Sequence, residues 1–391
     1  MNINNELKKY YLYNFIISAV DTGSGNFTMV YFYFHGFSVI DILVGILAYA
    51  LTCLIIIKPV GILLEKIGPQ NTFRLHGVFE ALKYFSLLLI FILPTLQLEF
   101  FLLWQIFNGF NVMLGRIPLT AYFSIYGDNG KRGLQIGLMN DIQILASVIV
   151  PVVAGTLIDR TGIVYIATIT TVVNILAIFV LNFDGRIKIT NRVNFGKLFS
   201  SVPMAFTKSF FVGKLVYPFA ADLLSIYIAI SLRSFTILGV FVGLRTLASI
   251  FLNYFVGKMT DAHLMRRFFY GTVLISSVFW LILPFVHETL AIFLLQFTFG
   301  LAGLITSIPF ESAYHNVAKE SGNSIEYALW REVVIQMGIV VGTAFVILVL
   351  KFDLVSDWRI LLPLGSISTL ALLFVLPYLG GENEKMIKNV G

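Results

Sequence analysis

Residues 39–68 read VIDILVGILAYALTCLIIIKPVGILLEKIG, an apolar run whose last part is a charged pair between two glycines. An α-helix needs about 20 apolar residues to cross the hydrocarbon core of a bilayer, and this run exceeds that length. A strand of a membrane barrel instead shows an alternating pattern over roughly ten residues. The stretch therefore predicts a transmembrane helix and argues against a barrel.

The composition of the whole chain agrees with this interpretation. Charged residues make up 12% of the 391 residues, hydrophobic residues make up 58%, and the mean hydropathy is +0.88. An ordinary soluble domain has about 25% charged residues. The composition excludes a soluble globular protein and predicts an integral membrane protein.

The sequence lacks the common motifs of nucleotide-binding and metal-binding proteins. It has no GxxxxGK[ST] phosphate loop, no HExxH motif and no spaced Cys/His cluster, and Cys53 is the one cysteine. A single cysteine forms no disulfide or thiolate metal site within one chain. We therefore expect no enzymatic activity, no ATP-driven transport by this chain alone, no cofactor and no metal site.

Apolar runs separated by polar or Gly/Pro clusters predict an all-α integral membrane protein with twelve transmembrane helices. Their approximate bounds are 10–34, 39–63, 73–95, 98–125, 133–158, 162–182, 204–231, 235–256, 268–287, 289–317, 325–350 and 358–379.

Basic residues predict the orientation of these helices. One set of connections, which includes both termini, carries sixteen lysines and arginines, whereas the opposite set carries only Arg160, Arg233, Lys351 and Arg359. Cytoplasmic loops are enriched in basic residues. We therefore predict a multi-pass protein of the plasma (inner) membrane with both termini in the cytoplasm, and the net charge of +6 requires no nucleic-acid partner.

The chain also shows signs of internal duplication. The longest predicted connection, residues 184–201, separates two sets of six helices, so we predict bundles at 1–183 and 202–391 joined by a cytoplasmic linker. An offset of 191 residues aligns similar residues in two helix pairs, which favours two pseudo-symmetric six-helix bundles. The aligned pairs are Gln105 with Gln296, Gly109 with Gly300, Ile117-Pro118 with Ile308-Pro309, and Asp141 with Glu332.

The segment Gly61-Ile62-Leu63-Leu64-Glu65-Lys66-Ile67-Gly68 resembles the loop signature of the major facilitator superfamily. A weaker second copy, Gly257-Lys258-Met259-Thr260-Asp261, follows the predicted helix 235–256. The resemblance implies a gating role in which Glu65 binds the start of the eleventh helix and Asp261 binds the start of the fifth. A carboxylate accepts from exposed N–H groups at a helix start and complements its dipole. A loop turn that only sets topology is the alternative.

Helices that line the cavity in this superfamily contain helix-breaking residues here. Pro118, Pro151 and Pro309 lie within predicted helices, and residues 150–155 resemble part of an antiporter-associated Gly-Pro motif that ends at Gly155. Proline removes a backbone hydrogen bond and marks kinks, so we predict hinges at these positions. Residues 105–109 lack the arginine-led motif of many proton-coupled drug exporters, which disfavours drug export.

Several charges fall inside the predicted helices, where ionisable groups are costly and usually functional. Counting from the cytoplasmic ends at 1.5 Å per residue places one set at a depth of roughly 10–12 Å. This layer is open to three interpretations: a cytoplasmic gate, a proton relay or static bracing. Glu80 and Lys83 can also simply pair along their helix, and Glu311 and His315 lie one turn apart as a proton-passing pair or a plain hydrogen bond. The layer comprises Glu80, Arg116, Asp141, Glu311, His315, Arg331 and Glu332.

Asp21 is predicted to lie near the membrane midplane, before the flexible sequence Thr22-Gly23-Ser24-Gly25. At this depth desolvation favours a neutral carboxyl group, which suits proton loading and release. We predict a proton-coupling or substrate site at Asp21, Asp222 and Arg245, with Arg245 as counter-charge. A structural cap or a permanent bond to a neighbouring helix is the alternative for Asp21.

These observations predict a secondary active transporter, a symporter or an antiporter, that moves a small organic solute by alternating access. The proton is the expected coupling ion, and we expect a monomer in the lipid bilayer. A lipid or lipid-precursor flippase is an alternative, which an amphipathic cavity open to the bilayer would distinguish. A non-transporting membrane sensor or partner protein is a third possibility.

Overall fold

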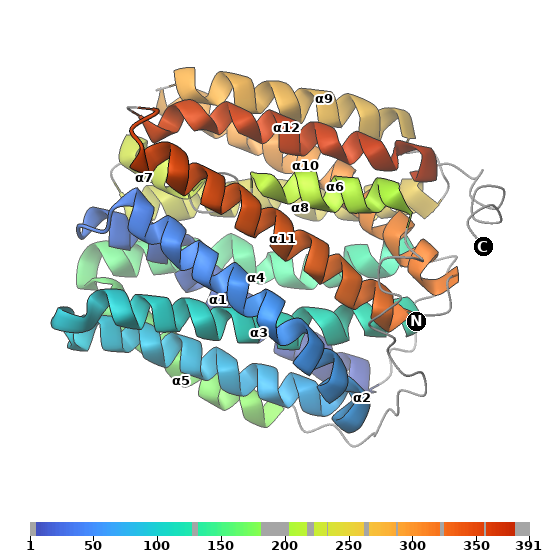
Figure 1. The fold of residues 1–391 in the computed structure, drawn as a ribbon, viewed down its shortest axis with the longest axis horizontal. Coiled ribbons are helices and arrows are strands. Elements are labelled where there is room, and N and C mark those ends of the chain that lie inside the picture. The colour runs from blue at the N-terminus through green and yellow to red at the C-terminus, as the bar shows by residue number, and fades with distance from the viewer. Residues whose placement is uncertain are drawn as a thin grey trace. The chain divides into compact units, whose positions relative to one another are not determined.

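A computed structural model describes residues 5–126, 132–180, 203–216, 223–232, 234–261, 266–286, 288–320, 324–355 and 357–379. Nearly all of these described residues are helical, and none of them forms a strand. The fold is therefore all-α, as the sequence predicts (Figure 1).

The chain forms two compact units. The first comprises Met1–Leu119, Ile142–Arg192 and Ala221–Leu244, and the second comprises Thr120–Asp141, Val193–Ala220 and Arg245–Gly391. The division at 184–201 that the sequence suggests stays a prediction.

The first five α-helices cover the first six predicted runs, because α2 contains two of them. They are α1 (Asn5–Phe34), α2 (Val39–Ile92), α3 (Gln97–Tyr126), α4 (Arg132–Thr161) and α5 (Ile163–Val180), with the short 3-10 helix η1 (Pro94–Leu96) after α2.

The later elements include several short pieces. They are α6 (Met204–Leu215), α7 (Leu224–Leu232), α8 (Phe235–Asp261), α9 (Arg266–Ile282), η4 (Leu283–Phe285), α10 (Thr289–Glu320), α11 (Ser324–Lys351), η5 (Trp358–Leu364), α12 (Gly365–Leu370) and η6 (Ala371–Leu379).

Six described segments are long and apolar enough to cross a membrane by length and composition. They are Val39–Gly68, Asn71–Ile92, Arg266–Phe285, Thr289–Ala318, Ile325–Lys351 and Trp358–Pro377. The segments Ile163–Ala177 and Phe235–Leu244 are shorter apolar helices. The last predicted helix differs in detail from the prediction, because most of it is 3-10 helix around Pro363 and Pro377.

Within the first unit, α5 packs against both α1 and α2 (Figure 1). Phe32 of α1 is buried and packs edge-to-face on Phe101 and Trp104 of α3, with ring centroids 5.1 and 6.4 Å apart. Edge-to-face contacts of this kind add stability beyond the area that they bury. An aromatic core therefore joins α1 to α3.

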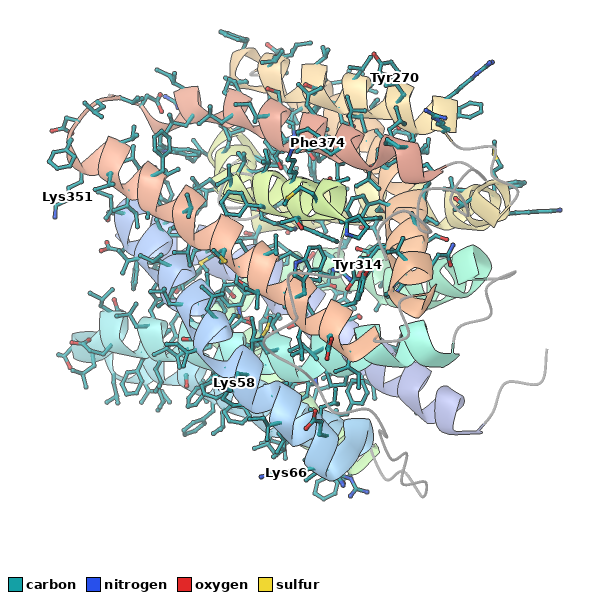
Figure 2. The ribbon with its side chains drawn as sticks, turned by 45° about the vertical axis from the view of Figure 1, so that its right-hand side comes forward. Lys58, Lys66, Tyr270, Tyr314, Lys351 and Phe374 are labelled. Atoms are coloured by element: carbon teal, nitrogen blue, oxygen red, sulfur yellow. The ribbon has the colours of Figure 1, made fainter. Side chains whose placement is uncertain are left out.

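Within the second unit, α11 packs on α6, and α9 packs on α10 and α12. Phe210 of α6 makes edge-to-face contacts with Phe310, Tyr314 and Trp330, with centroids 5.0, 5.5 and 6.0 Å apart. Tyr314 of α10, which is labelled in Figure 2, also contacts the ring of Tyr327, with centroids 6.4 Å apart. Its hydroxyl donates to the backbone oxygen of Tyr327, 2.7 Å away, so the cluster connects α6, α10 and α11.

The aligned residues of the proposed duplication occupy similar positions in the two units. Gln105 and Gln296 are both buried near the starts of α3 and α10. Ile117 and Ile308 are also buried, and each precedes a proline inside its helix. These positions support an internal repeat.

The connection between the second and third predicted helices is much shorter than expected. The sequence suggests a loop over residues 64–72, but α2 continues through it and departs from helical geometry only at Gly68, with φ 76° and ψ 168°. This combination is essentially restricted to glycine. Pro69 follows, and its fixed φ suits the first position of the next helix. The predicted loop signature therefore occupies the last turns of a helix and a one-residue bend.

We predict that Gly68→Ala lowers the free energy of unfolding by roughly 1–3 kcal/mol, because alanine is strained at a positive φ of this kind. Thermal unfolding of the purified protein in detergent measures the effect. Gly25→Ala is the matched control, since a Cβ added at Gly25 meets no atom within 4 Å. Equal stability of the two variants would contradict the strain argument.

Candidate functional site

Lys83 is at the centre of a charged cluster in the first unit. Its Nζ lies 2.8 Å from Asp21 Oδ1 and 2.8 Å from Glu80 Oε1, so one ammonium group binds two carboxylates. The Tyr84 hydroxyl also donates to Asp21 Oδ1 at 2.8 Å, and the Ser24 hydroxyl donates to the Tyr84 oxygen at 2.6 Å. The cluster thus links α1 to α2.

The spacing of the residues explains the assembly. Lys83 and Tyr84 follow Glu80 by three and four residues, so all three side chains lie on the same side of α2. Asp21 and Ser24 are three residues apart and share one face of α1. Both helices are held beside α5. Packing of the helices consequently brings the two faces together.

Burial within the cluster is uneven. The side chains of Glu80 and Lys83 are 0% and 3% exposed, whereas the Asp21 side chain is 47% exposed. Breaking a buried ion pair leaves an uncompensated charge, which is strongly destabilising. Lys83 therefore neutralises a carboxylate that has no access to solvent, and Asp21 is the part of the cluster that a proton or a solute can reach.

The charges of the cluster do not balance when all three groups are ionised. Two carboxylates and one ammonium give a net charge of −1. Lys83 and Tyr84 both donate to Asp21 at Oδ1. One additional proton within the cluster would make it neutral.

A second charged cluster lies in the second unit. Arg331 of α11 is 2.6 Å from Glu311 of α10, and His315 Nε2 is 3.9 Å from the other oxygen of Glu311. The Arg331 guanidinium lies over the rings of Phe210 and Tyr314, at 5.3 and 5.1 Å. The aromatic rings stabilise this cation at a partly buried site.

Buried polar groups continue along α11. The side chains of Glu332 and Gln336 are almost fully buried, and they lie one turn apart on one face of the helix. Glu332 Oε2 and both amide atoms of Gln336 have no hydrogen-bond partner among the residues that the structure describes. Unpartnered buried polar groups are rare and call for an explanation.

The structure divides the predicted site residues into separate groups. Glu80 belongs with Asp21, and Glu311, His315 and Arg331 belong together. Arg116 is exposed on α3. Asp222 lies outside the described residues, as do the side chains of Arg245, Asp141, Gly257 and Asp261. A single layer of interacting charges remains a prediction.

Sequence reasoning missed the role of Lys83. The sequence offers its pairing with Glu80 as one alternative, and the structure contains that pair, but we expected Arg245 and not Lys83 to oppose Asp21. The sequence did contain an indication of this role. Glu80 is the only acid within one turn of Lys83 on its own helix, so a second acidic partner of Lys83 must come from another helix. No property of a single helix shows which acid on α1 lies opposite.

The predicted gating and hinge residues lie within helices. Gly61 is buried and Glu65 is half-buried near the end of the first part of α2. Pro118, Pro151 and Pro309 lie inside α3, α4 and α10 and are buried. Gly155 is buried in α4, one turn after Pro151.

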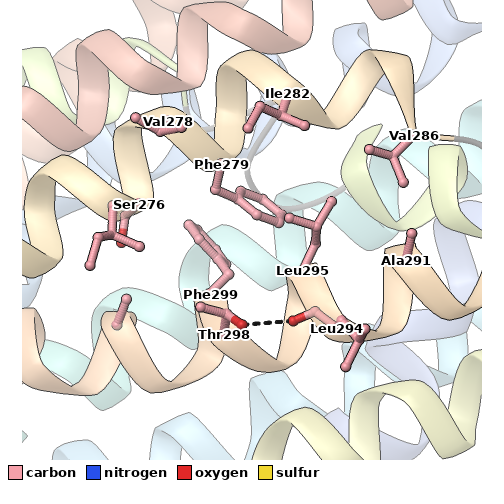
Figure 3. A pocket seen from close by; sticks show the side chains of 12 residues that line it. Ser276, Val278, Phe279, Ile282, Val286, Ala291, Leu294, Leu295, Thr298 and Phe299 are labelled. Atoms are coloured by element: carbon pink, nitrogen blue, oxygen red, sulfur yellow. Dashed lines mark hydrogen bonds between the residues drawn. The ribbon is translucent and has the colours of Figure 1, made fainter.

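An apolar pocket of about 450 Å³ lies between α9 and α10 (Figure 3). Its polar side chains are Ser276 and Thr298, and the Thr298 hydroxyl donates to the backbone oxygen of Leu294 at 2.8 Å. Leu294 and Ile275 at its rim are largely exposed. The lining is therefore almost entirely apolar.

Comparison with known proteins shows similarity in structure but not in sequence. No protein-family model matches the chain, and no curated protein matches it. A crystal structure of a bacterial homologue of the iron transporter ferroportin, in an outward-facing state, matches 96% of this chain and 98% of its own, with a TM-score of 0.64 and 14% identity. A crystal structure of a variant of the E. coli fucose:proton symporter matches 95% of both chains, with a TM-score of 0.61 and 12% identity.

These matches confirm the fold that the sequence predicts. Both similar structures have the fold of major facilitator superfamily transporters, which have twelve transmembrane helices. The chain therefore has the fold of the major facilitator superfamily and is a multi-pass membrane protein.

We predict that Lys83→Met destabilises the protein by about 3 kcal/mol, since it leaves Glu80 as an unpaired buried carboxylate. Adding Glu80→Gln to this variant should restore much of the loss, because the amide carries no charge. Thermal unfolding in detergent measures both variants. A double variant no more stable than Lys83→Met alone would contradict the role of the ion pair.

Proposed function

We propose that this protein is a proton-coupled secondary transporter of a small organic solute that works by alternating access, with Asp21 as the residue that carries the proton. The observation that carries this proposal is the exposed Asp21 carboxylate bonded to Lys83, which is itself buried against Glu80. Fold alone does not define function, so the proposal depends on this cluster.

Protonation changes the partners of Lys83. When a proton binds Asp21, the carboxylate becomes a neutral carboxyl group and its ion pair with Lys83 is lost. Lys83 then retains Glu80, which lies on the same helix, so the ionic contact between α1 and α2 disappears. Proton binding would therefore favour a state in which α1 moves relative to α2, and such differential binding is what couples an ion to a conformational change.

The remaining charged groups fit supporting roles in the same cycle. We propose that Glu311, Arg331 and His315 form part of a cytoplasmic gate, and that Glu65 and Asp261 bind helix starts as the superfamily resemblance implies. Gly61, Gly68 and Gly257 would permit close approach there, and Pro118, Pro151, Gly155 and Pro309 would be hinges. Asp222 and Arg245 stay proposed contributors to the substrate site.

The same proposal includes the cellular setting. The protein would be a monomer in the plasma (inner) membrane with both termini in the cytoplasm, because basic residues concentrate in that set of connections. A lipid or lipid-precursor flippase stays the alternative function.

We predict that Asp21→Asn abolishes uphill, pH-driven transport but preserves exchange at equal solute concentrations. Asparagine keeps the size and polarity of the side chain, but it cannot take up a proton in this pH range. The measurement uses purified protein in liposomes that contain a pH dye, with sugars, amino acids, organic acids, nucleosides and lipophilic cations as solutes. The direction of proton flow relative to the solute distinguishes symport from antiport.

Asp41→Asn is the matched control for this measurement. Asp41 is an acid of the same unit, but it bonds Ser38 in the cap at the start of α2 and not a buried lysine. It should transport as the wild type does. Retained uphill accumulation in Asp21→Asn would remove Asp21 from coupling, and loss of both transport modes would indicate a role in binding or folding.

We also predict that Glu65→Gln reduces the transport rate at least fivefold while thermal stability and expression change little. Glu65 is half-buried at the end of a helix, where loss of its charge weakens a gate contact without opening the core. Parallel loss of expression and transport would indicate a structural role instead.

A further inference from the structure

The carboxylate of Asp159 joins two helices that are far apart in the sequence. Asp159 lies at the end of α4 and accepts four hydrogen bonds from the start of α8. Its Oδ1 accepts the N–H of Phe235 at 3.1 Å. Its Oδ2 accepts the N–H and hydroxyl of Thr236 at 2.9 and 2.6 Å and the hydroxyl of Ser234 at 3.0 Å.

The two helices are also in direct backbone contact. A Cβ added at Gly155 would lie 2.2 Å from the backbone oxygen of Phe235, and one added at Gly239 would lie 2.2 Å from that of Pro151. Small residues allow membrane helices to approach this closely. The carboxylate contact is therefore the exposed end of a longer interface between α4 and α8.

Aromatic residues connect the start of α8 to α1. The Phe235 ring packs edge-to-face on Phe27 and Phe34, with ring centroids 6.2 and 6.1 Å apart. Because Phe27 lies less than two turns from Asp21 on α1, a movement at the start of α8 reaches the helix that carries the proposed proton site.

The contact between Asp159 and the start of α8 is favourable, but it is also accessible to water. The first N–H groups of a helix have no partner within it, and they favour a negative charge. Partial burial raises the pKa of Asp159, but the hydrogen bonds from Thr236, Phe235 and Ser234 outweigh this effect and bring the pKa below its ordinary value. The carboxylate is therefore ionised at neutral pH. Asp159 is exposed, so water can replace these bonds when the helices separate.

We propose that Asp159 and the first residues of α8 form a latch on the outer side of the membrane, which holds the ends of α4 and α8 together and must release before the solute path opens outward. The proposal goes beyond the proposed transport activity by naming the contact that controls access from one side. It assumes alternating access, but its test requires neither a solute nor a gradient.

Cysteine labelling tests the latch. Cys53 is buried, and Cys53→Ala provides a background without reactive thiols. Gly25→Cys is the reporter, because Gly25 is exposed, lies one turn from Asp21 on the same face of α1, and has no atom within 4 Å of an added Cβ. A membrane-impermeant maleimide is added to the outside of intact cells, and the labelling rate is measured.

We predict that Asp159→Asn raises this rate at least threefold and that Asp159→Ala raises it further. Asp357→Asn is the matched control and should leave the rate unchanged. Asp357 also caps a helix start, but its partner Arg359 is two residues away, so it joins no distant elements. Its pKa is likewise held below the ordinary value by the hydrogen bond from Arg359.

Thr236→Val provides a second test that keeps Asp159 intact. It removes the shortest of the four hydrogen bonds and should raise the labelling rate by a smaller factor. Unchanged or slower labelling in folded Asp159→Ala and Thr236→Val variants would overturn the latch. Faster labelling together with failure of all transport assays would support the latch and contradict the proposed transport function.

Discussion

Lys83 is an ammonium group that has almost no contact with solvent, and its position constrains how α1 and α2 of the first unit pack together. Moving a lone charge from water into a membrane protein is very costly, and only close acidic partners offset this cost. Asp21 and Glu80 meet that requirement at 2.8 Å each. Because Asp21 is on another helix, this ion pair joins α1 to α2.

This connection explains why the cluster suits coupling. Glu80 is on the same helix as Lys83, so a movement of α2 as a whole leaves the ion pair between them intact. The pair with Asp21 crosses between helices and includes the exposed carboxylate, which a proton can neutralise. The pair of Lys83 with Glu80 therefore does not depend on the position of α1, whereas the pair with Asp21 does. The second unit has a comparable pair, Glu311 with Arg331, but there the cation is held by aromatic rings in addition to the acid.

Most of the fold could be predicted from the sequence, because long apolar runs have one stable solution in lipid, a helix that satisfies its own backbone. The bend at Gly68 could not, since hydropathy does not distinguish a polar loop from polar turns at a helix end. At the site, burial cost singled out Asp21 and Glu80 as candidates. Their connection through Lys83 and the contact of Asp159 with α8 depend on how helices meet, and no pattern within a single helix contains that information.

The bend at Gly68 has a mechanical consequence. One residue of extended chain spans at most about 3.6 Å, so the two parts of α2 cannot draw apart at this end. Glu65 lies just before the bend, and Lys83 lies on the helix that follows it. A displacement of one part must therefore become a tilt of the other about a fixed pivot. In the proposed transport cycle, this pivot would transmit the loss or gain of a proton at Asp21 to the membrane surface, because no flexible loop lies between the two parts of α2 to absorb the motion.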